Sequence, residues 1–456
     1  MSDPPALDVA GRRVIVLGLG VTGRSVASIL SRRGASVLAS DVSDVADTGE
    51  LRADGVEVET GGHDRAAAEL GRADFVVPSP GISPHRGFLA EVVGSGARIV
   101  SELDLGAAMT AAPIVGVTGT NGKTTVCLLA EGIARAHGLD AFMCGNTEYP
   151  FLAAVDDHPD ADLFIVEASS FRLHFSESFH PRVSVMTNFA PDHLDWHATL
   201  DEYRSAKARI AQRQVGGDLF VYPDDQRDLA ELAPPNGPDR MPFGTGPIEG
   251  SDGAWFDGGD IVVRRNRRDV VAHGAGELAE RAPHFASNAA AAAAALVFLG
   301  AESDDIERAL GSFEVAQHRL DPVGTLNGIR VIDDSVAANT HATIAALRRF
   351  DRVVLIAGGR NKGIDLSPLA GEASRIKAVV ALGEATEELG SVFAPTGVPV
   401  KAAGSMREAV DVALARAEPG DVVLLSPACA SLDMFRNYAD RGRQFVEACR
   451  TAGVAK

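Results

Sequence analysis

The chain has 456 residues, of which 46% are hydrophobic and 23% charged, so ordinary buried cores are available and the length predicts two to four domains. Its formal net charge of −19 argues against general binding to nucleic acid or anionic membranes, and any phosphate site must therefore be built locally. The four cysteines show no C-x-x-C spacing, which favours reduced, buried thiols over disulfides or zinc ligands. The chain has no apolar signal region and no run of about 18 apolar residues, so we expect a cytoplasmic protein without a membrane span.

The first predicted unit is a β-α-β arrangement. An apolar run at 14–17 leads directly into Gly-Leu-Gly-Val-Thr-Gly at 18–23, and a second strand at 36–39 precedes Asp41. A G-x-G-x-x-G turn with an acid after the next strand is typical of sheets that bind a dinucleotide or another nucleotide diphosphate. The motif is also compatible with tight packing of a helix on a strand. A turn at 78–82, Pro-Ser-Pro-Gly-Ile, follows a third strand, at the edge where open α/β sheets bind ligands.

The second predicted unit opens with a phosphate-binding loop. An apolar strand at 114–117 runs into Thr-Gly-Thr-Asn-Gly-Lys-Thr-Thr at 118–125, and a segment with helical spacing follows. In such a loop, backbone N–H groups hold anionic oxygens, Lys123 reaches the outer phosphates and a hydroxyl meets Mg²⁺. The general pattern has glycine where Val117 stands, so this is a variant of the motif. A glycine-rich turn that only starts a helix would not need Lys123, and we therefore predict binding of a nucleoside triphosphate.

Three later stretches of the second unit carry further candidates. The strand at 162–166 ends in Glu167, which would lie beside the loop in a doubly wound sheet and could hold Mg²⁺. A strand at 183–188 continues into a segment with two acids and a histidine, which is either a metal or phosphate site or a plain polar loop. The segment at 203–210 contains Lys207, and its pattern predicts a helix whose basic side chains face solvent.

For the remaining stretches, the sequence predicts secondary structure and domain organisation but no catalytic chemistry. The region 234–268 is rich in Gly, Pro and Asp and predicts loops and an edge sheet, whereas the alanine run at 289–295 predicts a closely packed helix. Beyond it, buried-type strands alternate with helical patterns, which predicts a second open parallel sheet. The predicted fold class is α/β with three domains: a Rossmann-like domain at 1–111, a central mononucleotide-binding domain at 112–318, and a C-terminal Rossmann-like domain at 319–456.

Eight stretches from all three units share their order and sequence with one family. They are GLGVTG at 18–23, SPGI at 79–82, TGTNGKTT at 118–125, EASSFRL at 167–173, DHLDWH at 192–197, YRSAKARI at 203–210, HRL at 318–320 and SPACASLDMFRNYADRG at 426–442. Together they resemble the Mur ligase family of the cytoplasmic peptidoglycan pathway. The last stretch resembles most the branch that adds D-glutamate.

The resemblance implies an enzyme that uses ATP to join D-glutamate to UDP-N-acetylmuramoyl-L-alanine through an acyl phosphate. Peptidoglycan synthesis links such an enzyme to cell shape and division. The resemblance assigns the glycine-rich turn at 18–23 to uridine diphosphate rather than NAD. It also implies two Mg²⁺ ions and a carbamylated Lys207, which sets the solvated-face interpretation aside. We expect no nucleic-acid partner and a monomer.

The resemblance also assigns a role to individual positions. The implied catalytic residues are Lys123, Glu167, His193 and Lys207, and the implied metal ligands are Thr124, Glu167, His193 and Lys207. The implied ATP contacts are Gly119, Thr120, Asn121, Gly122, Lys123, Thr124, Thr125, Asn288, Arg319 and Asp334. The implied substrate contacts are Thr22, Asp41, Ser79, Gly81, Asn146, Lys362, Ser431, Leu432 and Tyr438.

Several positions depart from the family pattern. Where the family commonly has D-S-K-A-T-N, this chain has Val336 in place of the lysine and Ala338 in place of the threonine. Arg360 could supply the missing charge, whereas Glu148 places an acid near an anionic substrate. A paralogue that adds a different amino acid therefore remains an alternative. Two others are an NAD-dependent oxidoreductase, which leaves the phosphate-binding loop unexplained, and a non-catalytic ATP-binding subunit, which needs no carbamate.

Overall fold

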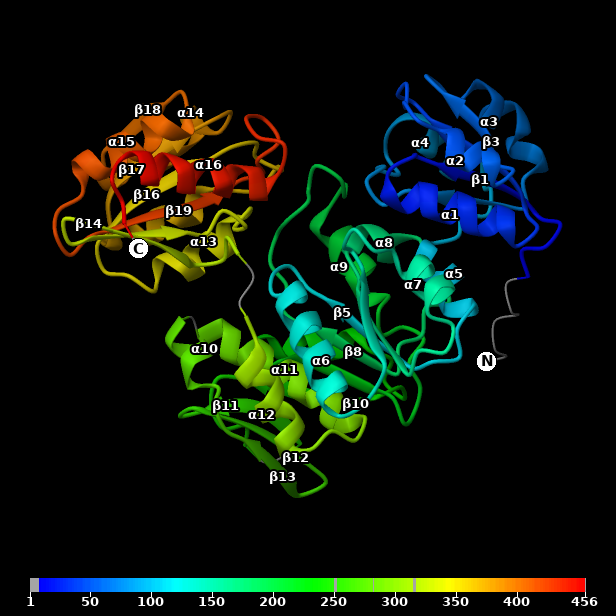
Figure 1. Ribbon diagram of the computed structural model, residues 1–456, viewed down its shortest axis with the longest axis horizontal. Coiled ribbons are helices and arrows are strands. Elements are labelled where there is room, and N and C mark those ends of the chain that lie inside the picture. The colour runs from blue at the N-terminus through cyan, green and yellow to red at the C-terminus, as the bar shows by residue number, and fades with distance from the viewer. Residues whose placement is uncertain (1–7, 250–251, 282, 315–316, 456) are drawn as a thin grey trace. The chain divides into compact units, whose positions relative to one another are not determined.

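A computed structural model of the protein describes residues 8–249, 252–281, 283–314 and 317–455 (Figure 1). The chain divides into two compact units, one formed by residues 1–189 and 196–313 and the other by 190–195 and 314–456. Within the described residues, the strands form sheets of four, nine and six strands. Helices pack on these sheets, which confirms the predicted α/β class. Among these same residues, no helix combines the length and the apolar character needed to cross a membrane.

The N-terminal sheet has the order β3-β2-β1-β4, and its strands are parallel. Its side chains alternate between two helix-covered faces: Val14 and Val16 pack with α1, whereas Ile15 and Leu17 pack towards α3 and α4. The elements are β1 (Arg13–Leu17), α1 (Val21–Arg32), β2 (Ser36–Asp41), α2 (Gly49–Ala53), β3 (Glu57–Thr60), α3 (Asp64–Glu69), β4 (Phe75–Pro78), α4 (Gly87–Ser95) and α5 (Glu102–Ala108).

The central sheet is parallel from β11 to β6 and has the order β13-β12-β11-β10-β9-β8-β5-β7-β6. The strands are β5 (Ile114–Thr118), β6 (Ala141–Gly145), β7 (Leu163–Glu167), β8 (Val183–Met186), β9 (Leu219–Pro223), β10 (Asp239–Gly244), β11 (Gly253–Asp257), β12 (Asp260–Arg265) and β13 (Arg268–Ala272). The helices are α6 (Lys123–Ala136), α7 (Phe151–Asp157), α8 (Ser170–His174), α9 (Leu200–Ala208), α10 (Gly276–Arg281), α11 (Pro283–Phe298) and α12 (Ser303–Ser312).

Two features of this sheet test the sequence predictions. The alanine run forms α11, whose side chains from Ala289 to Ala295 are buried against α6 and the sheet, as predicted. The region 234–268 contains the predicted edge sheet, in which β11, β12 and β13 pair antiparallel, but it also holds more regular structure than predicted, because β10 and β11 continue the parallel sheet. Pairing with neighbouring strands supplies the order that the Gly- and Pro-rich composition did not indicate.

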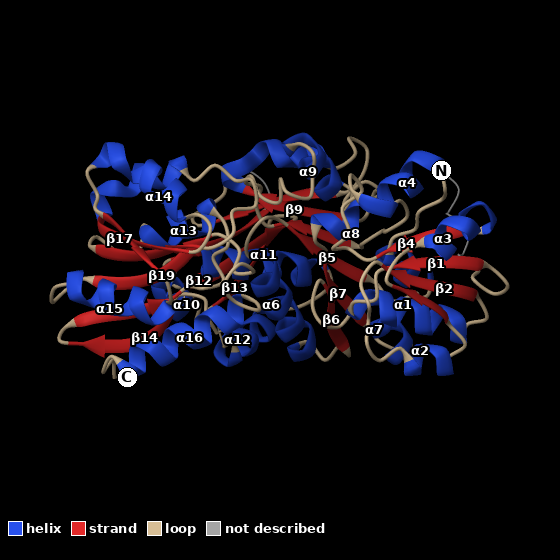
Figure 2. Cartoon of the chain, turned by 90° about the horizontal axis from the view of Figure 1, so that it is seen from above, coloured by secondary structure: helices blue, strands red, loops and turns tan. Residues whose placement is uncertain are grey.

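The sheet of the second unit has the order β14-β15-β19-β16-β17-β18 and is parallel from β15 to β18. Helices α13 and α14 lie on one face and α15 and α16 on the other, and both layers are visible beside the strands in Figure 2. The elements are β14 (Asp321–Leu326), β15 (Ile329–Asp333), α13 (Thr340–Leu347), β16 (Val353–Gly358), β17 (Ile376–Leu382), α14 (Thr386–Phe393), β18 (Val400–Ala403), α15 (Met406–Arg416), β19 (Val422–Ala428) and α16 (Tyr438–Thr451).

The four cysteines are free and buried, which confirms the prediction drawn from their spacing. They lie in α6, at the end of β6, after β19 and in α16, as Cys127, Cys144, Cys429 and Cys449.

Asp104 in α5 holds the segment that leads into β8. Its buried carboxylate accepts four hydrogen bonds of 2.7–3.1 Å, from the hydroxyl of Ser176 and the backbone N–H groups of Glu177, Ser178 and Phe179. A buried carboxylate is tolerated only when donors replace its lost water, and here the donors also fix the backbone that precedes a central strand.

We expect Asp104→Asn to destabilise the first unit by about 2 kcal/mol, because the amide group offers one acceptor oxygen where the carboxylate offered two. The measurement is the thermal unfolding midpoint by calorimetry, with the exposed Asp160→Asn as the matched control. Equal midpoints for the two variants would contradict this role of Asp104.

Candidate functional site

The loop at 118–125 joins the carboxyl end of β5 to α6 and adopts a conformation that needs glycine at two positions. Gly119 has a φ of +144° and Gly122 a φ of +84°. A Cβ atom at Gly119 would lie 1.8 Å from the Thr187 hydroxyl oxygen, and one at Gly122 would lie 2.9 Å from Asn288 Oδ1. The loop therefore approaches its neighbours through bare backbone, at the N-terminus of a 14-residue helix that favours an anion.

The end of β8 fixes the shape of this loop. The Thr187 hydroxyl donates to the carbonyl oxygen of Asn121 over 2.6 Å. The Asn188 side chain accepts from the Asn121 N–H over 3.0 Å and donates to its carbonyl over 3.0 Å. Asn188 thus binds both the backbone N–H and the backbone carbonyl of Asn121. The sequence pattern did not assign this role to it.

Two lysines converge on one carbonyl of the loop. Lys123 Nζ donates to the carbonyl oxygens of Gly119 and Thr120, both at 3.0 Å. Lys207 Nζ, from α9, donates to the same Gly119 oxygen over 2.6 Å. The Lys207 side chain is buried and its Nζ lies 4.6 Å from the centre of the Tyr203 ring, so it is not the solvated basic face suggested by its pattern.

Glu167 lies at the carboxyl end of β7, beside the loop as predicted. Its buried carboxylate accepts from the Thr124 hydroxyl over 2.8 Å and from the Asn146 amide over 3.1 Å. A carboxylate and a hydroxyl this close form the all-oxygen donor set that Mg²⁺ prefers, so these residues fit the metal. Asn146, predicted as a substrate contact, here orients the carboxylate.

The predicted residues of the N-terminal sheet surround its glycine-rich turn. The Leu19 N–H donates to Asp41 over 2.7 Å, and the Ser79 hydroxyl donates to the Gly18 carbonyl over 3.0 Å. The Thr22 hydroxyl accepts from Arg172 Nη2 over 3.0 Å, and Gly81 lies exposed in the turn after β4.

The glycines of this turn meet the needs of both interpretations of the motif. A Cβ at Gly23 would lie 1.8 Å from the Gly18 carbonyl oxygen, which is the close packing that the third glycine allows. A Cβ at Gly20 would meet nothing within 4 Å, which leaves the room at this position that a diphosphate requires.

In the second unit, the segment 190–195 is tied to its sheet through Asp192. The buried Asp192 carboxylate pairs with Lys362 Nζ at 2.5 Å and accepts from the Asn339 amide over 2.9 Å. Burial raises the pKa of Asp192, but the charges of His193 and Lys362 outweigh it and hold the pKa below its usual value. His193 follows with a φ of +55° and a ring that is one-third exposed. The sequence analysis placed Asp192 in the stretch DHLDWH at 192–197, but it did not predict the ion pair with Lys362.

The predicted ATP contacts of the second unit include a fully buried acid. Asp334 accepts from the Ser426 hydroxyl over 2.9 Å and from the Leu320 N–H over 3.2 Å. Burial raises its pKa to about 7, although Ser426 and the nearby charge of Arg319 act in the opposite direction. His318, beside Arg319, lies 2.6 Å from Asp333 through its Nδ1.

The predicted amino-acid pocket has both buried and exposed members. Ser431 is buried, whereas Leu432 and Tyr438 are exposed, and Val336 is half-buried. Arg360 forms a two-contact ion pair with Glu384, at 3.0 and 3.1 Å, and both side chains are exposed.

Family models match the chain in three consecutive regions. The Mur ligase MurD-like N-terminal domain matches residues 12–101, the Mur ligase middle domain matches 117–296, and the Mur ligase glutamate ligase domain matches 318–429.

Curated relatives match the chain along nearly its full length. The UDP-N-acetylmuramoylalanine–D-glutamate ligase of Pelotomaculum thermopropionicum is 37% identical over 448 residues, which cover 96% of this chain and 98% of the relative. The ligase of the same name from Salinibacter ruber is 38% identical over 453 residues, covering 96% and 97%. Among solved structures, a pseudomurein peptide ligase type C from Methanothermus fervidus has a TM-score of 0.60 at 17% identity, covering 97% of this chain and 100% of its own, which supports the fold.

We expect Gly119→Ala to weaken binding of MgADP at least about tenfold, because the new Cβ meets the Thr187 hydroxyl and the φ of +144° strains any other residue by roughly 1–3 kcal/mol. The measurement is calorimetric titration with MgADP. Gly132→Ala in α6 is the matched control, since its Cβ would lie 3.5 Å from Ala309 Cβ of α12, an ordinary contact. Wild-type affinity in Gly119→Ala would refute the assignment of the loop.

Proposed function

Because the chain belongs to the Mur ligase family, we propose that it is the ATP-dependent ligase that adds D-glutamate to UDP-N-acetylmuramoyl-L-alanine in cytoplasmic peptidoglycan precursor synthesis. The observation that carries the substrate assignment is identity of 37–38% along 96% of the chain to ligases of that name. The loop at 118–125, with Glu167 and Lys207 beside it, supports the use of a nucleoside triphosphate.

The chain's own residues divide the work of binding ATP. The N–H groups of Thr120 and Asn121 are bound by Asn188, so the backbone N–H groups at the N-terminus of α6 are assigned to the phosphates. Lys123 releases its two carbonyl contacts to reach the outer phosphate. Asn288, next to Gly122, Arg319 and Asp334 are assigned to the rest of the nucleotide.

The N-terminal sheet is assigned to the uridine diphosphate of the acceptor substrate. The turn at 18–23 offers its backbone to the diphosphate, and Thr22, Asp41, Ser79 and Gly81 surround that turn. This assignment uses both nucleotide motifs of the chain, whereas an NAD-dependent oxidoreductase would leave the loop at 118–125 without a role.

The reaction joins a carboxylate to an amine in two steps. The carboxylate of the substrate's alanine attacks the γ-phosphorus of ATP, ADP leaves and an acyl phosphate forms. The amine of D-glutamate then attacks the acyl carbon and loses a proton, inorganic phosphate leaves and the amide forms. Lys123 offsets the repulsion between the two approaching anions and stabilises the transferring phosphoryl group.

We assign the metal ligands to Thr124, Glu167, His193 and a carbamylated Lys207, which would hold two Mg²⁺ ions. Bound Mg²⁺ neutralises phosphate charge and polarises the transferring group. The Thr124 hydroxyl and the Glu167 carboxylate supply hard oxygen ligands, and Asn146 orients that carboxylate through its amide.

The convergence of two ammonium groups on the Gly119 carbonyl supports the carbamate. Two cations at one oxygen repel each other, and an ammonium at position 207 would also repel Mg²⁺. Attack of the neutral Lys207 amine on CO₂ forms an N–C bond, releases a proton and leaves an anionic carboxylate. The modification turns a like-charge pair, Lys123 and Lys207, into an opposite-charge pair and adds oxygen ligands.

A second candidate function is a paralogue of this ligase that adds a different amino acid to the same or a related acceptor. Val336 removes a cation expected near the amino acid, and Glu148 adds an acid near an anionic substrate. These two substitutions change the charge expected near the amino-acid substrate, whereas the residues assigned to phosphoryl transfer match the family pattern.

We expect D-glutamate to give the highest kcat/KM in a panel of D- and L-amino acids, measured as phosphate release with ATP and UDP-N-acetylmuramoyl-L-alanine. Lys123→Ala is the control for background hydrolysis, because it removes the cation at the outer phosphate. Little turnover with D-glutamate beside clear turnover with another amino acid would replace the first function with the second.

We expect ¹³C-bicarbonate to label the wild-type protein with a carbamate signal in NMR that disappears in Lys207→Ala. The exposed Lys401→Ala is the matched control and should retain the signal. A wild-type spectrum without the signal would refute the carbamate at Lys207 and leave the ligase assignment to the amino-acid panel.

A further inference from the structure

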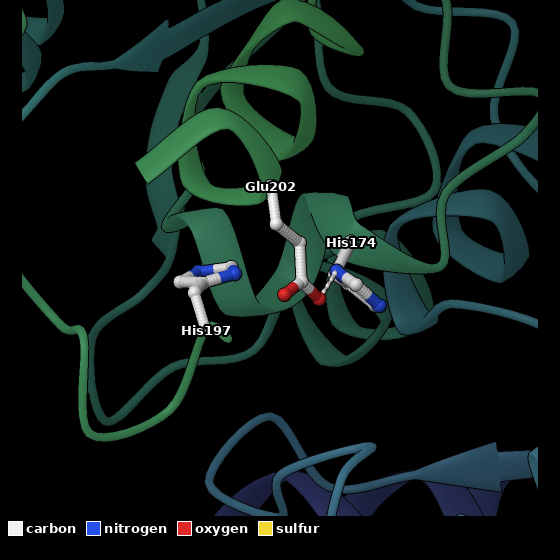
Figure 3. A group of neighbouring side chains, drawn as sticks. All are labelled: His174, His197 and Glu202. Carbon is white, nitrogen blue, oxygen red and sulfur yellow. Dashed lines mark ion pairs between the residues drawn. The ribbon is translucent and has the colours of Figure 1, made fainter. Parts of the chain in front are cut away.

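A second group of metal-binding side chains lies in the first unit, apart from the residues assigned to phosphoryl transfer. One ring nitrogen of His174, one ring nitrogen of His197 and one carboxylate oxygen of Glu202 lie within 4.8 Å of one another. Figure 3 shows the Glu202 carboxylate between the two imidazole rings. The three residues come from the end of α8, the segment before α9 and the first turn of α9.

The distances within this group suit ligands of one ion better than hydrogen-bond partners. His174 Nδ1 lies 3.6 Å from Glu202 Oε1, which is longer than a hydrogen bond. Two ligands on a tetrahedral zinc ion, each bonded at about 2.1 Å, lie about 3.4 Å apart. The pair is therefore spaced as two ligands of a common ion would be.

His197 supplies an independent observation. Its side chain is buried, with 1% of the residue exposed, and its Nε2 lies 3.0 Å from the Ser170 hydroxyl. Its Nδ1 is buried and has no hydrogen-bond partner among the described residues. A buried ring nitrogen without a partner costs roughly 1–3 kcal/mol, and coordination to a cation would remove that cost.

The surroundings give the group the order that a metal site needs. The Glu202 carboxylate also accepts from the Ala198 N–H over 2.7 Å, while the Thr199 hydroxyl accepts from the Glu202 N–H over 3.1 Å. The rings of Phe171 and Trp196 pack on His197 and limit access of water. The carboxylate is therefore held in place by the first turn of α9 before any ion binds.

His85 contacts the Glu202 carboxylate as a hydrogen-bond partner and lies outside the group of three. His85 Nε2 lies 2.9 Å from Glu202 Oε1 and 3.0 Å from Oε2, and its ring is partly exposed. A set of two imidazoles and one carboxylate favours Zn²⁺, Co²⁺ or Ni²⁺ over Mg²⁺, which prefers oxygen ligands throughout. The group thus differs in metal preference from the Thr124 and Glu167 oxygens.

We propose that His174, His197 and Glu202 form a binding site for a divalent transition-metal ion, with zinc as its natural occupant and water at the remaining coordination position. The ion cross-links α8, the segment before α9 and α9 itself. Since α9 also carries Lys207, bound zinc fixes the helix that positions this lysine.

The test is titration of the full-length, chelator-treated protein with Co²⁺ in the presence of excess Mg²⁺, followed by visible absorption. We expect one Co²⁺ per chain, with the intense bands of a four-coordinate site, and displacement by Zn²⁺. His174→Gln and Glu202→Gln should each weaken Co²⁺ binding at least about tenfold. His273→Gln is the matched control, since His273 forms an exposed pair with Asp260 at 2.8 Å elsewhere in the same unit.

Three outcomes decide the proposal without reference to ligase activity. Co²⁺ bands that survive in Glu167→Gln but fade in His174→Gln would support a separate site. Wild-type protein without such bands, or with the same affinity as His174→Gln, would overturn it. X-ray absorption of the zinc-loaded wild type provides a readout that needs no variant: histidine scattering supports the site, and an all-oxygen shell refutes it.

Discussion

The shape of the phosphate-binding loop depends on the contact between Gly119 and the end of β8. At Gly119 the backbone passes so close to the Thr187 hydroxyl that a Cβ would overlap it at 1.8 Å. This closeness lets Thr187 and Asn188 hold the next residues of the loop at the N-terminus of α6, where the helix dipole favours an anion. The parallel strands β5, β7 and β8 end at one edge of the sheet, and the loop, Glu167 and Asn188 meet there as a result.

The sequence predicted what depends on neighbouring residues. Apolar runs gave the strands, and the glycine, lysine and threonine of the loop gave its conformation, because each is required locally by a strand, a turn and a helix start. The edge sheet within 234–268 was predicted, but its strands β10 and β11 were harder to predict. Their Gly- and Pro-rich sequence favours loops, and only pairing with strands already in the sheet, such as β9, makes them regular.

The candidate site shows the same limit. Glu167 was predicted beside the loop because the carboxyl ends of parallel strands share an edge, and it lies there. The partners of Asn146 and Asp192 were not predicted, since Glu167 and Lys362 lie far away along the chain. His174, His197 and Glu202 carry no recognisable spacing either. Their juxtaposition follows from the way α8 packs on α9, which tertiary structure alone determines.

The cations of the second unit differ in how readily they can bind an anionic amino acid. Lys362 is paired with the buried Asp192, so a substrate carboxylate would have to break a buried ion pair and leave Asp192 without its partner, which is costly. Arg360 is paired with Glu384 at the surface, where solvent screens the two charges and the pair is readily exchanged. Because Val336 offers no charge, Arg360 is the cation that can turn to a substrate carboxylate at the smallest cost.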